Sequence, residues 1–187
     1  TSIKALAYQL YENNGVLKRE NVIEYVKHLD QNDRKVLRDL GVKFGRYHIF
    51  LFKLIKPEAV SLRSLLWKNY HQKYFNLNPP KFGLNFLDNK NLDQKFMLLC
   101  GFEKFNNYFI RIDILERLFV QIINSNNDQD NKNIKMVPEM LNLLGCNKEN
   151  FKKLLKNMNY KIIEKNEDIY FKYTPKKITK KIYTKNN

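Results

Sequence analysis

The stretch PEMLNLLGCNKENFKKLLKNM, residues 138–158, predicts two short helices joined by a tight turn. Proline is favoured at the first position of a helix, so the first helix begins at Pro138, and Gly145 ends it. Asn147 is a typical N-cap for the second helix, which extends to about residue 158. The apolar face of this second helix consists of Phe151, Leu154, Leu155 and Met158.

The elements on either side of this pair complete a recognisable order. A strand over 108–111 leads into a helix over 113–123, a polar loop covers 125–133, and a short strand is expected at 134–137. After the two helices, strands at 161–163 and 169–173 flank a charged tip at 164–168. Helix, strand, helix, turn, helix and hairpin together predict a winged helix-turn-helix.

The first half of the chain is expected to be mostly helical. Three short helices are predicted in the first 40 residues, the third capped by Asp30 and closed by Gly41. A hairpin is predicted near 42–51, with Gly45 supplying the freedom that a tight turn needs. Pro57 then begins a helix whose buried face is expected to carry Ala59, Leu62, Leu66 and Trp67. A loop over 85–91 precedes a short helix at 93–100.

The predicted fold class is therefore mainly α with small β elements. We expect a helical N-terminal subdomain with a short hairpin over residues 1–103, and a winged helix-turn-helix-like subdomain over residues 104–175. Residues 176–187 are expected to form a basic flexible tail. No internal repeat is visible in the sequence.

Net charge suggests a class of partner. The 187 residues include 34 Lys and Arg against 19 Asp and Glu, a net charge of +15, which favours a polyanion such as nucleic acid. The alternative is that the composition of an AT-rich genome enriched lysine without selection for binding. Cys100 and Cys146 lie far apart in the sequence and are expected to be reduced. The sequence contains no run of 18 apolar residues, so no membrane span is expected. A cytoplasmic protein is expected, and the first residue, Thr1, suggests an excerpt from a longer chain.

Motifs of catalysis are not found. The sequence has no GxxxxGK followed by Ser or Thr, no HExxH and no cysteine cluster for zinc, so neither an ATP site nor a metal site is expected in this chain. His28, His48 and His71 lie in different predicted elements without a paired nucleophile. Asp113 and Glu116 lie three residues apart on a predicted helix, and the flanking Arg111 and Arg117 favour a salt-bridged surface.

Two regions are candidates for nucleic-acid binding. On the second helix of the pair, Lys152, Lys153 and Lys156 point away from the apolar face, and a solvated helix face is the alternative. The wing and tail add further lysines: Lys161, Lys165, Lys172, Lys176, Lys177, Lys180, Lys181 and Lys185. In the hairpin, Arg46 and the ring of Tyr47 could contact single-stranded bases, although the alternation of residues there favours a core role.

Four segments resemble, in order, a known protein family. They are GVLKRENV at 15–22, GVKFGRYHIFLFKLIKPEAVSLRSLLW at 41–67, IRIDILERL at 110–118, and PEMLNLLGCNKENFKKLLKNMNYK at 138–161. Together they resemble the region downstream of the motor in bacterial MgpS-type DExH-box helicases, which are related to the mitochondrial degradosome RNA helicase. These motifs are structural rather than catalytic.

The resemblance implies a division of labour in a longer parent chain. ATP and Mg²⁺ would be bound by two RecA-like motor domains before Thr1, and this region would need no cofactor of its own. It would be a non-catalytic accessory region with nucleic acid, RNA in particular, and the motor domains as partners. The alternative is a protein-interaction module that docks the motor or an RNA-processing partner, which a broad exposed apolar patch would favour.

Overall fold

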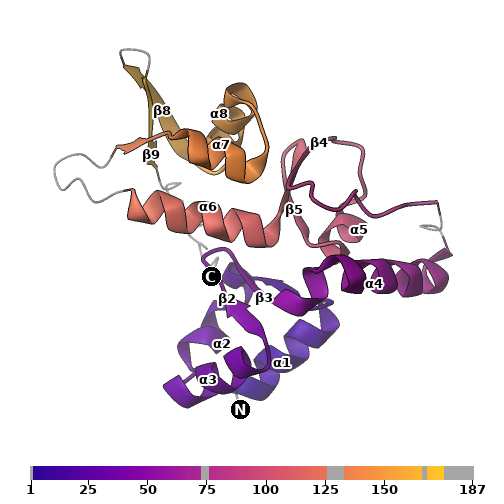
Figure 1. Cartoon of the computed structure of the whole chain (residues 1–187). Coiled ribbons are helices and arrows are strands. Elements are labelled where there is room, and N and C mark those ends of the chain that lie inside the picture. The colour runs from indigo at the N-terminus through magenta and orange to yellow at the C-terminus, as the bar shows by residue number, and fades with distance from the viewer. Residues whose placement is uncertain (1, 73–75, 126–132, 166–167, 175–187) are drawn as a thin grey trace, which may run out of the picture.

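The computed structural model describes residues 2–72, 76–125, 133–165 and 168–174. Of these residues, 52% are helical and 22% lie in strands, so the chain is a mixed α/β protein with small antiparallel sheets. The predicted combination of helices with small β elements is confirmed, but the strands are more numerous than predicted. Figure 1 shows the arrangement of the elements named below.

The first unit comprises residues 2–51. Its elements are α1 (Ser2–Glu12), β1 (Val16–Lys18), a 3-10 turn at Arg19–Val22, α2 (Ile23–Lys27), α3 (Gln31–Asp39), β2 (Val42–Phe44) and β3 (His48–Leu51). The Asp30 side chain caps α3 by accepting from the backbone N–H of Asp33 at 2.7 Å, as predicted. The predicted hairpin is present, but β1 was not predicted, and it pairs with β3 to make a three-stranded sheet.

The second unit comprises residues 57–111. Its elements are α4 (Pro57–Tyr70), β4 (Phe86–Asp88), α5 (Gln94–Leu99), β5 (Phe102–Phe105) and β6 (Tyr108–Arg111). The predicted starts of α4 at Pro57 and of α5 after Asp93 are confirmed. Strand β4 lies where a loop was expected, and strand β5 was not expected. The predicted subdomain boundary after residue 103 falls inside β5.

The third unit comprises residues 112–173. Its elements are α6 (Ile112–Asn124), β7 (Ile134–Lys135), α7 (Pro138–Leu144), α8 (Lys148–Asn157), β8 (Tyr160–Lys165) and β9 (Asp168–Tyr173). Gly145 ends α7 in the left-handed region at φ 68°, and the Asn147 side chain caps α8. These elements match the sequence prediction closely because proline, glycine and asparagine mark their ends.

One connectivity recurs in the three units, although the sequence shows no repeat. In each sheet the last strand lies between the other two, giving the orders β1-β3-β2, β4-β6-β5 and β7-β9-β8. Each unit also begins with a long helix and ends with a hairpin, and the second has one helix where the others have two. Three segments without visible sequence similarity therefore adopt a similar order of helices and strands.

Three hydrophobic clusters correspond to the three units, and a smaller cluster joins them. Leu6 and Ile49 belong to the first, Phe96 and Phe109 to the second, and Leu115 and Phe171 to the third. The joining cluster contains Val16 and Phe50 of the first unit, Ile55 of the segment that follows it and Ile112 of the third unit, and Leu98 of the second unit packs against it. Helix α6 lies between the first unit and the helices α7 and α8 (Figure 1).

The buried face of α4 differs from the prediction. Val60 and Ser64 are buried, whereas Leu62 and Leu66 are 58% and 59% exposed. The helix packs through Val60 and Trp67 against the second cluster, and Arg63 donates to the backbone oxygens of Leu54 and Leu99 at 2.8 and 3.4 Å. The prediction for Leu62 and Leu66 was therefore wrong, and α4 presents leucines to solvent.

Candidate nucleic-acid interface

Helix α8 presents lysines on the side opposite its core face. Phe151, Leu154 and Leu155 are fully buried, which fixes the rotation of the helix. Lys153 and Lys156 are exposed, and neither forms an ion pair with the described residues. These two side chains point away from the apolar face of the helix, as predicted.

Lys152 has a different role from its neighbours. Its ammonium lies 3.2 Å from Glu149 and 2.8 Å from Glu164, and its side chain is only 19% exposed. Hydrogen bonds to Glu164 and Glu149 raise the pKa of Lys152 and stabilise its charge. Lys152 therefore joins α8 to strand β8, and its charge is already balanced within the protein.

The outer face of the third sheet is a second basic surface. Side chains alternate along a strand, and Ile134, Tyr160, Ile169 and Phe171 face the core. Lys161 and Lys172 therefore face outward, and they are direct partners across β8 and β9. Tyr170 lies on the same face, directly opposite Lys135 of β7. Lys135 is paired with Asp168 at 2.6 Å, whereas Lys161 and Lys172 form no ion pair among the described residues.

Like charges placed directly across an antiparallel pair destabilise it, since the side chains start about 4.5–5.5 Å apart. The Lys161–Lys172 pair is therefore a position where a bound anion would relieve repulsion. The tail lysines Lys176, Lys177, Lys180 and Lys181 lie outside the described residues.

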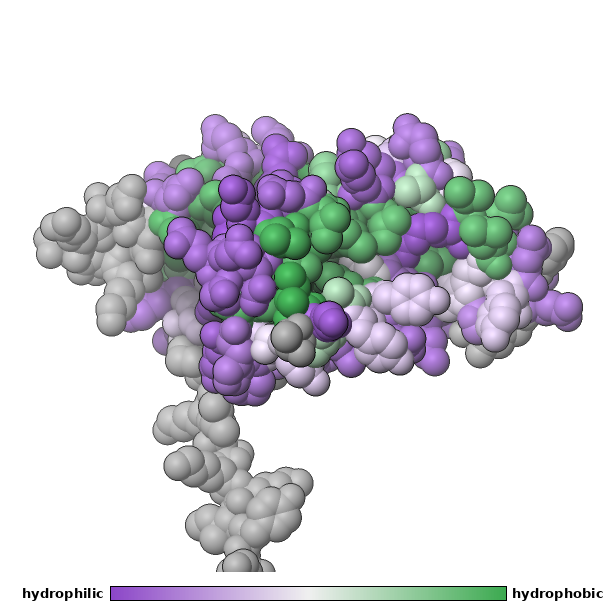
Figure 2. All heavy atoms as spheres, turned by 90° about the horizontal axis from the view of Figure 1, so that it is seen from below, coloured by the Kyte–Doolittle hydropathy of each residue, from purple (hydrophilic) through white to green (hydrophobic). Residues whose placement is uncertain are grey.

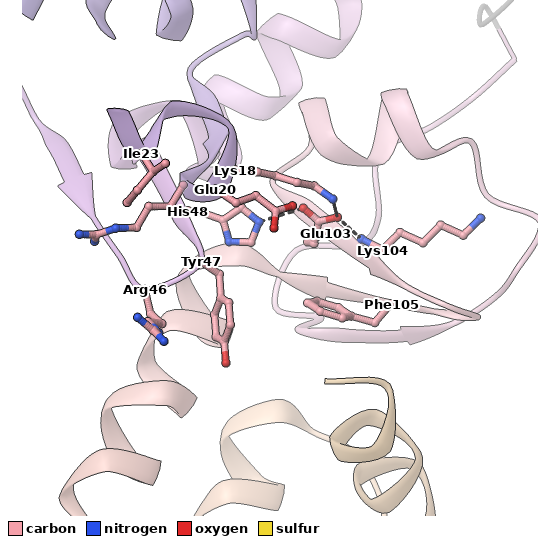
Figure 3. A pocket seen from close by; sticks show the side chains of 10 residues that line it. Lys18, Glu20, Ile23, Arg46, Tyr47, His48, Glu103, Lys104 and Phe105 are labelled. Carbon is pink, nitrogen blue, oxygen red and sulfur yellow. Dashed lines mark hydrogen bonds and ion pairs between the residues drawn. The ribbon is translucent and has the colours of Figure 1, made fainter. Parts of the chain in front are cut away.

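Arg46 and Tyr47, the two candidates in the first hairpin, lie at the junction of the units. The Tyr47 ring contacts Phe119 edge to face at 5.4 Å, and its hydroxyl hydrogen-bonds to Tyr160. Burial raises the pKa of Tyr47 above its ordinary value. Figure 3 shows this ring pointing toward the third unit. Tyr47 therefore packs between units, whereas Arg46 is exposed and lies 5.5 Å from the centre of the Phe119 ring.

Glu116 of α6 holds the turn of the same hairpin. Its carboxylate accepts hydrogen bonds from the backbone N–H groups of Arg46, Tyr47 and His48, the last two at 2.9 and 2.8 Å. Burial alone would raise the pKa of Glu116, but these bonds and the one from His48 lower it below 4.5. The predicted salt-bridged surface is found for Asp113, which pairs with Arg111 at 2.7 Å, but was wrong for Glu116, whose partners are His48 and backbone N–H groups.

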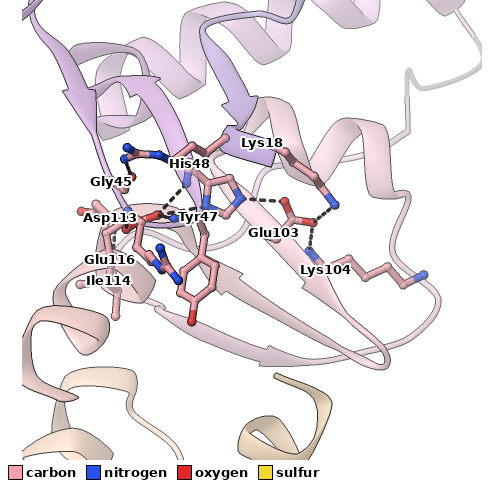
Figure 4. A network of polar contacts seen from close by, with 11 residues as sticks. Lys18, Gly45, Tyr47, His48, Glu103, Lys104, Asp113, Ile114 and Glu116 are labelled. Carbon is pink, nitrogen blue, oxygen red and sulfur yellow. Dashed lines mark hydrogen bonds and ion pairs between the residues drawn. The ribbon is translucent and has the colours of Figure 1, made fainter. Parts of the chain in front are cut away.

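The network continues through His48 into the second unit (Figure 4). The His48 ring is 2% exposed, and its two nitrogens lie 3.3 Å from Glu116 and 2.8 Å from Glu103. Glu103 in turn pairs with Lys18 at 3.1 Å. Burial lowers the pKa of His48, but the two carboxylates outweigh it and raise that pKa above 6.5. With both ring nitrogens occupied, this histidine connects three units rather than serving as a free base.

Gly45 is required by this network for a reason other than the one predicted. It does not have a positive φ, so the turn does not need a left-handed residue there. A Cβ on Gly45 would instead lie 2.3 Å from the carboxylate carbon of Glu116. The sequence places the glycine correctly, but its function is to leave room for Glu116.

A cleft of about 480 Å³ opens beside the network (Figure 3). Its lining includes Lys18, Arg19, Arg46 and Lys104 around the buried Glu103. The Lys104 ammonium lies 5.7 Å from the centre of the Phe109 ring. Lys18, Arg19 and Lys104 were not among the predicted site residues, because they belong to strands β1 and β5, which lacked a clear strand pattern, and to the turn after β1.

Comparison with known proteins adds no relative. No family model, no curated protein and no solved structure matches this chain. Within the described ranges, no cluster of three or more His, Cys, Asp or Glu side chains could hold a metal ion. Nor does any helix in the described part of the chain have the length and apolar character to cross a membrane.

Proposed function

We propose that this chain is a non-catalytic accessory region of an ATP-dependent RNA helicase, and that it binds the nucleic-acid backbone beside the motor domains of a cytoplasmic parent protein. The resemblance of four segments to MgpS-type helicases supports this proposal, together with the net charge of +15. ATP and Mg²⁺ would belong to the motor domains, since this chain has no phosphate-cradling sequence.

The third unit is proposed to be a winged helix, with α8 as the helix that approaches nucleic acid and β8–β9 as the wing. The order of elements and the exposed Lys153 and Lys156 on α8 support this assignment. No arginine lies in α8, and lysines suit phosphate contact better than base recognition. Binding is therefore expected to depend on charge and shape rather than on sequence.

The observation that carries the proposal is the juxtaposition of Lys161 and Lys172 on the outer face of the third sheet. Two unpaired ammonium groups in direct cross-strand register favour a phosphate between them. The test uses two double variants. One carries Lys161→Gln and Lys172→Gln, and the other carries Lys153→Gln and Lys156→Gln. Fluorescence anisotropy with unrelated RNA sequences, at several salt concentrations, measures affinity and salt slope.

Each contacted phosphate contributes roughly −0.7 to the log–log salt slope on single strands and about −0.9 on duplexes. Each double variant should therefore reduce the slope magnitude by about one to two and weaken all sequences similarly. A control variant carries Lys4→Gln and Lys95→Gln, which remove the same charge from exposed positions on α1 and α5. If both test variants behave like this control, the third unit is not the contact surface.

A second candidate function is protein docking through α4. Leu62, Leu65, Leu66 and Tyr70 are 54–83% exposed on one helix, and their spacing by three and four residues places them on one side. Figure 2 shows hydrophobic side chains exposed among hydrophilic ones on the face seen from below. Exposed apolar surface of this kind favours a protein contact, such as one with the motor domains.

The docking alternative is tested with the motor domains added as a separate chain. A variant with Leu62→Glu and Leu66→Glu should abolish binding measured by calorimetry. A variant with Val36→Glu and Leu40→Glu, exposed apolar residues in α3 and at its C-cap, should not. Equal binding by the two variants would exclude α4 as the contact.

A further inference from the structure

A groove of about 740 Å³ lies between the β2–β3 hairpin and helix α6, on the first and third units. It is separate from the lysines of α8 and of the third sheet. Its lining combines two kinds of side chain, basic residues and apolar or aromatic ones. The basic members are Arg19, Lys43, Arg46 and Arg117, and the apolar members include Phe44, Phe50, Phe52, Phe119, Val120 and Ile123.

The positive charge of this groove is not balanced by its acidic members. Asp113 is held by the Arg111 guanidinium through two contacts of 2.7 Å, and Glu116 is occupied by the backbone of the hairpin. Lys43 and Arg117 are exposed, and neither pairs with an acidic side chain among the described residues. The charged groups of the groove that remain available to a ligand are therefore cationic.

The apolar part of the groove is also without a partner. Val120 and Ile123 of α6 are 55% and 52% exposed, whereas Leu115, Leu118 and Ile122 of that helix pack into the core of the third unit.

We infer that this groove binds a segment of single-stranded nucleic acid, with phosphates at Lys43 and Arg117 and an unpaired base against the apolar floor. Aromatic side chains combined with arginines are the usual means of holding unpaired bases. A duplex keeps its bases stacked inside and offers no base face to the phenylalanines. The inference rests on the proposed nucleic-acid-binding function and adds a site that distinguishes single strands from duplexes.

The test uses the whole chain with a Lys43→Glu, Arg117→Glu variant. Its matched control is Lys4→Glu, Lys95→Glu, which changes net charge equally at exposed positions outside the groove. The probes are labelled oligouridylate, oligothymidylate, an abasic oligomer and an RNA duplex. The groove variant should bind oligouridylate about tenfold or more weakly than the control variant does, because both phosphate contacts are lost and the new carboxylates repel the phosphates. Duplex binding should be the same for the two variants.

Comparison of the four probes distinguishes the possible kinds of binding site. Loss of both oligouridylate and oligothymidylate binding supports a site for either strand, and loss of oligouridylate alone supports an RNA site. In the unmodified chain, equal affinity for the abasic and the intact oligomer would overturn the base contact. Equal oligouridylate binding by groove and control variants would overturn the inference, and the groove would then be a surface for an acidic protein.

A second readout keeps this result apart from failure of the proposed function. Uridine monophosphate added to the labelled protein should shift amide resonances of β2, β3 and α6 in NMR spectra, even if the lysines of the third unit contribute nothing. Unchanged spectra at millimolar nucleotide would count against the groove. If the variants of the third unit weaken RNA binding and the groove variant does not, the proposed function stands and the groove is not a binding site.

Discussion

The Glu116 carboxylate holds three backbone amides of a hairpin turn that lies about 70 residues earlier in the chain. A carboxylate that accepts several N–H bonds is strongly favoured in its charged form. Its side chain is 12% exposed, so water does not replace these bonds easily. The sequence alone suggests only a surface carboxylate beside Arg117, because the partners of Glu116 are backbone groups that no motif reveals.

Removal of this carboxylate should destabilise the protein. Glu116→Ala leaves His48 and the turn amides without their acceptor, and we expect a loss of about 3–5 kcal/mol in the free energy of unfolding, measured in urea. Arg117→Ala, the exposed neighbour, should change it by less than about 0.5 kcal/mol. Gly45→Ala should also destabilise, because its Cβ takes the space of the carboxylate. A Glu116→Ala variant as stable as Arg117→Ala would show that the turn does not depend on this contact.

The buried histidine predicts a pH dependence. The pKa of His48 is raised, so its contribution to stability is complete below 6.5 and is lost as pH rises through the raised value. The pKa values of Glu103 and Glu116 are lowered, so their contribution is present above 4.5 and lost as pH falls through the lowered values. Stability from this network should therefore be greatest between about pH 4.5 and 6.5.

The measurement is the melting temperature against pH for the unmodified chain and for His48→Gln. The unmodified chain should lose stability as the pH rises above 6.5, by about 1.4 kcal/mol for each unit by which folding raises the pKa of His48. His48→Gln should lack this loss. Parallel curves would mean that His48 is neutral in the folded protein.

At the scale of elements, the residues that mark helix ends predicted those ends correctly, whereas the buried face of a helix was harder to predict. Pro57, Pro138, Gly145 and Asn147 marked helix ends correctly because each acts through its own backbone geometry. Strands β1, β4 and β5, each three or four residues long, were not predicted, although the equally short β2 and β6 were. The face of α4 was assigned wrongly because Leu62 and Leu66 are apolar yet exposed. The joining of distant elements at Glu116 depends on tertiary packing and could not be derived from local pattern.

Helix α8 allows two adjacent lysines to be distinguished. Lys152→Gln removes the ion pairs with Glu149 and Glu164, so it should lower the melting temperature slightly and leave the salt slope of RNA binding unchanged. Lys153→Gln should leave the melting temperature unchanged and reduce the magnitude of the salt slope by about one at most. Thermal denaturation and anisotropy on the same preparations test both. If Lys152→Gln also reduces the slope, its ion pairs open when nucleic acid binds.

At the scale of the whole molecule, the units are connected by polar and apolar contacts at one junction. The network runs from Lys18 through Glu103 and His48 to Glu116, and the cluster of Val16, Phe50, Ile55 and Ile112 lies in the same region of contact between units. Three small cores joined in this way can unfold together only while the junction holds.

Calorimetry should therefore record one transition for the unmodified chain, with calorimetric and van't Hoff enthalpies in agreement. Glu116→Ala should broaden the transition or divide it, because the third unit loses its polar contact with the first. Lys4→Ala, on the outside of α1, is the control and should leave the shape unchanged. A single sharp transition in Glu116→Ala would assign the coupling to the apolar cluster instead.

The only tryptophan of the chain, Trp67, lies on α4, the helix that carries the exposed leucines. Its half-buried indole stacks on Phe96 at 6.2 Å and meets the edge of His71 at 5.1 Å. Intrinsic emission excited at 295 nm therefore comes from this helix alone. A protein that covers α4 should shift that emission to the blue, whereas an oligonucleotide in the groove beside α6 should leave its colour unchanged, so one optical signal separates the two kinds of partner without any label.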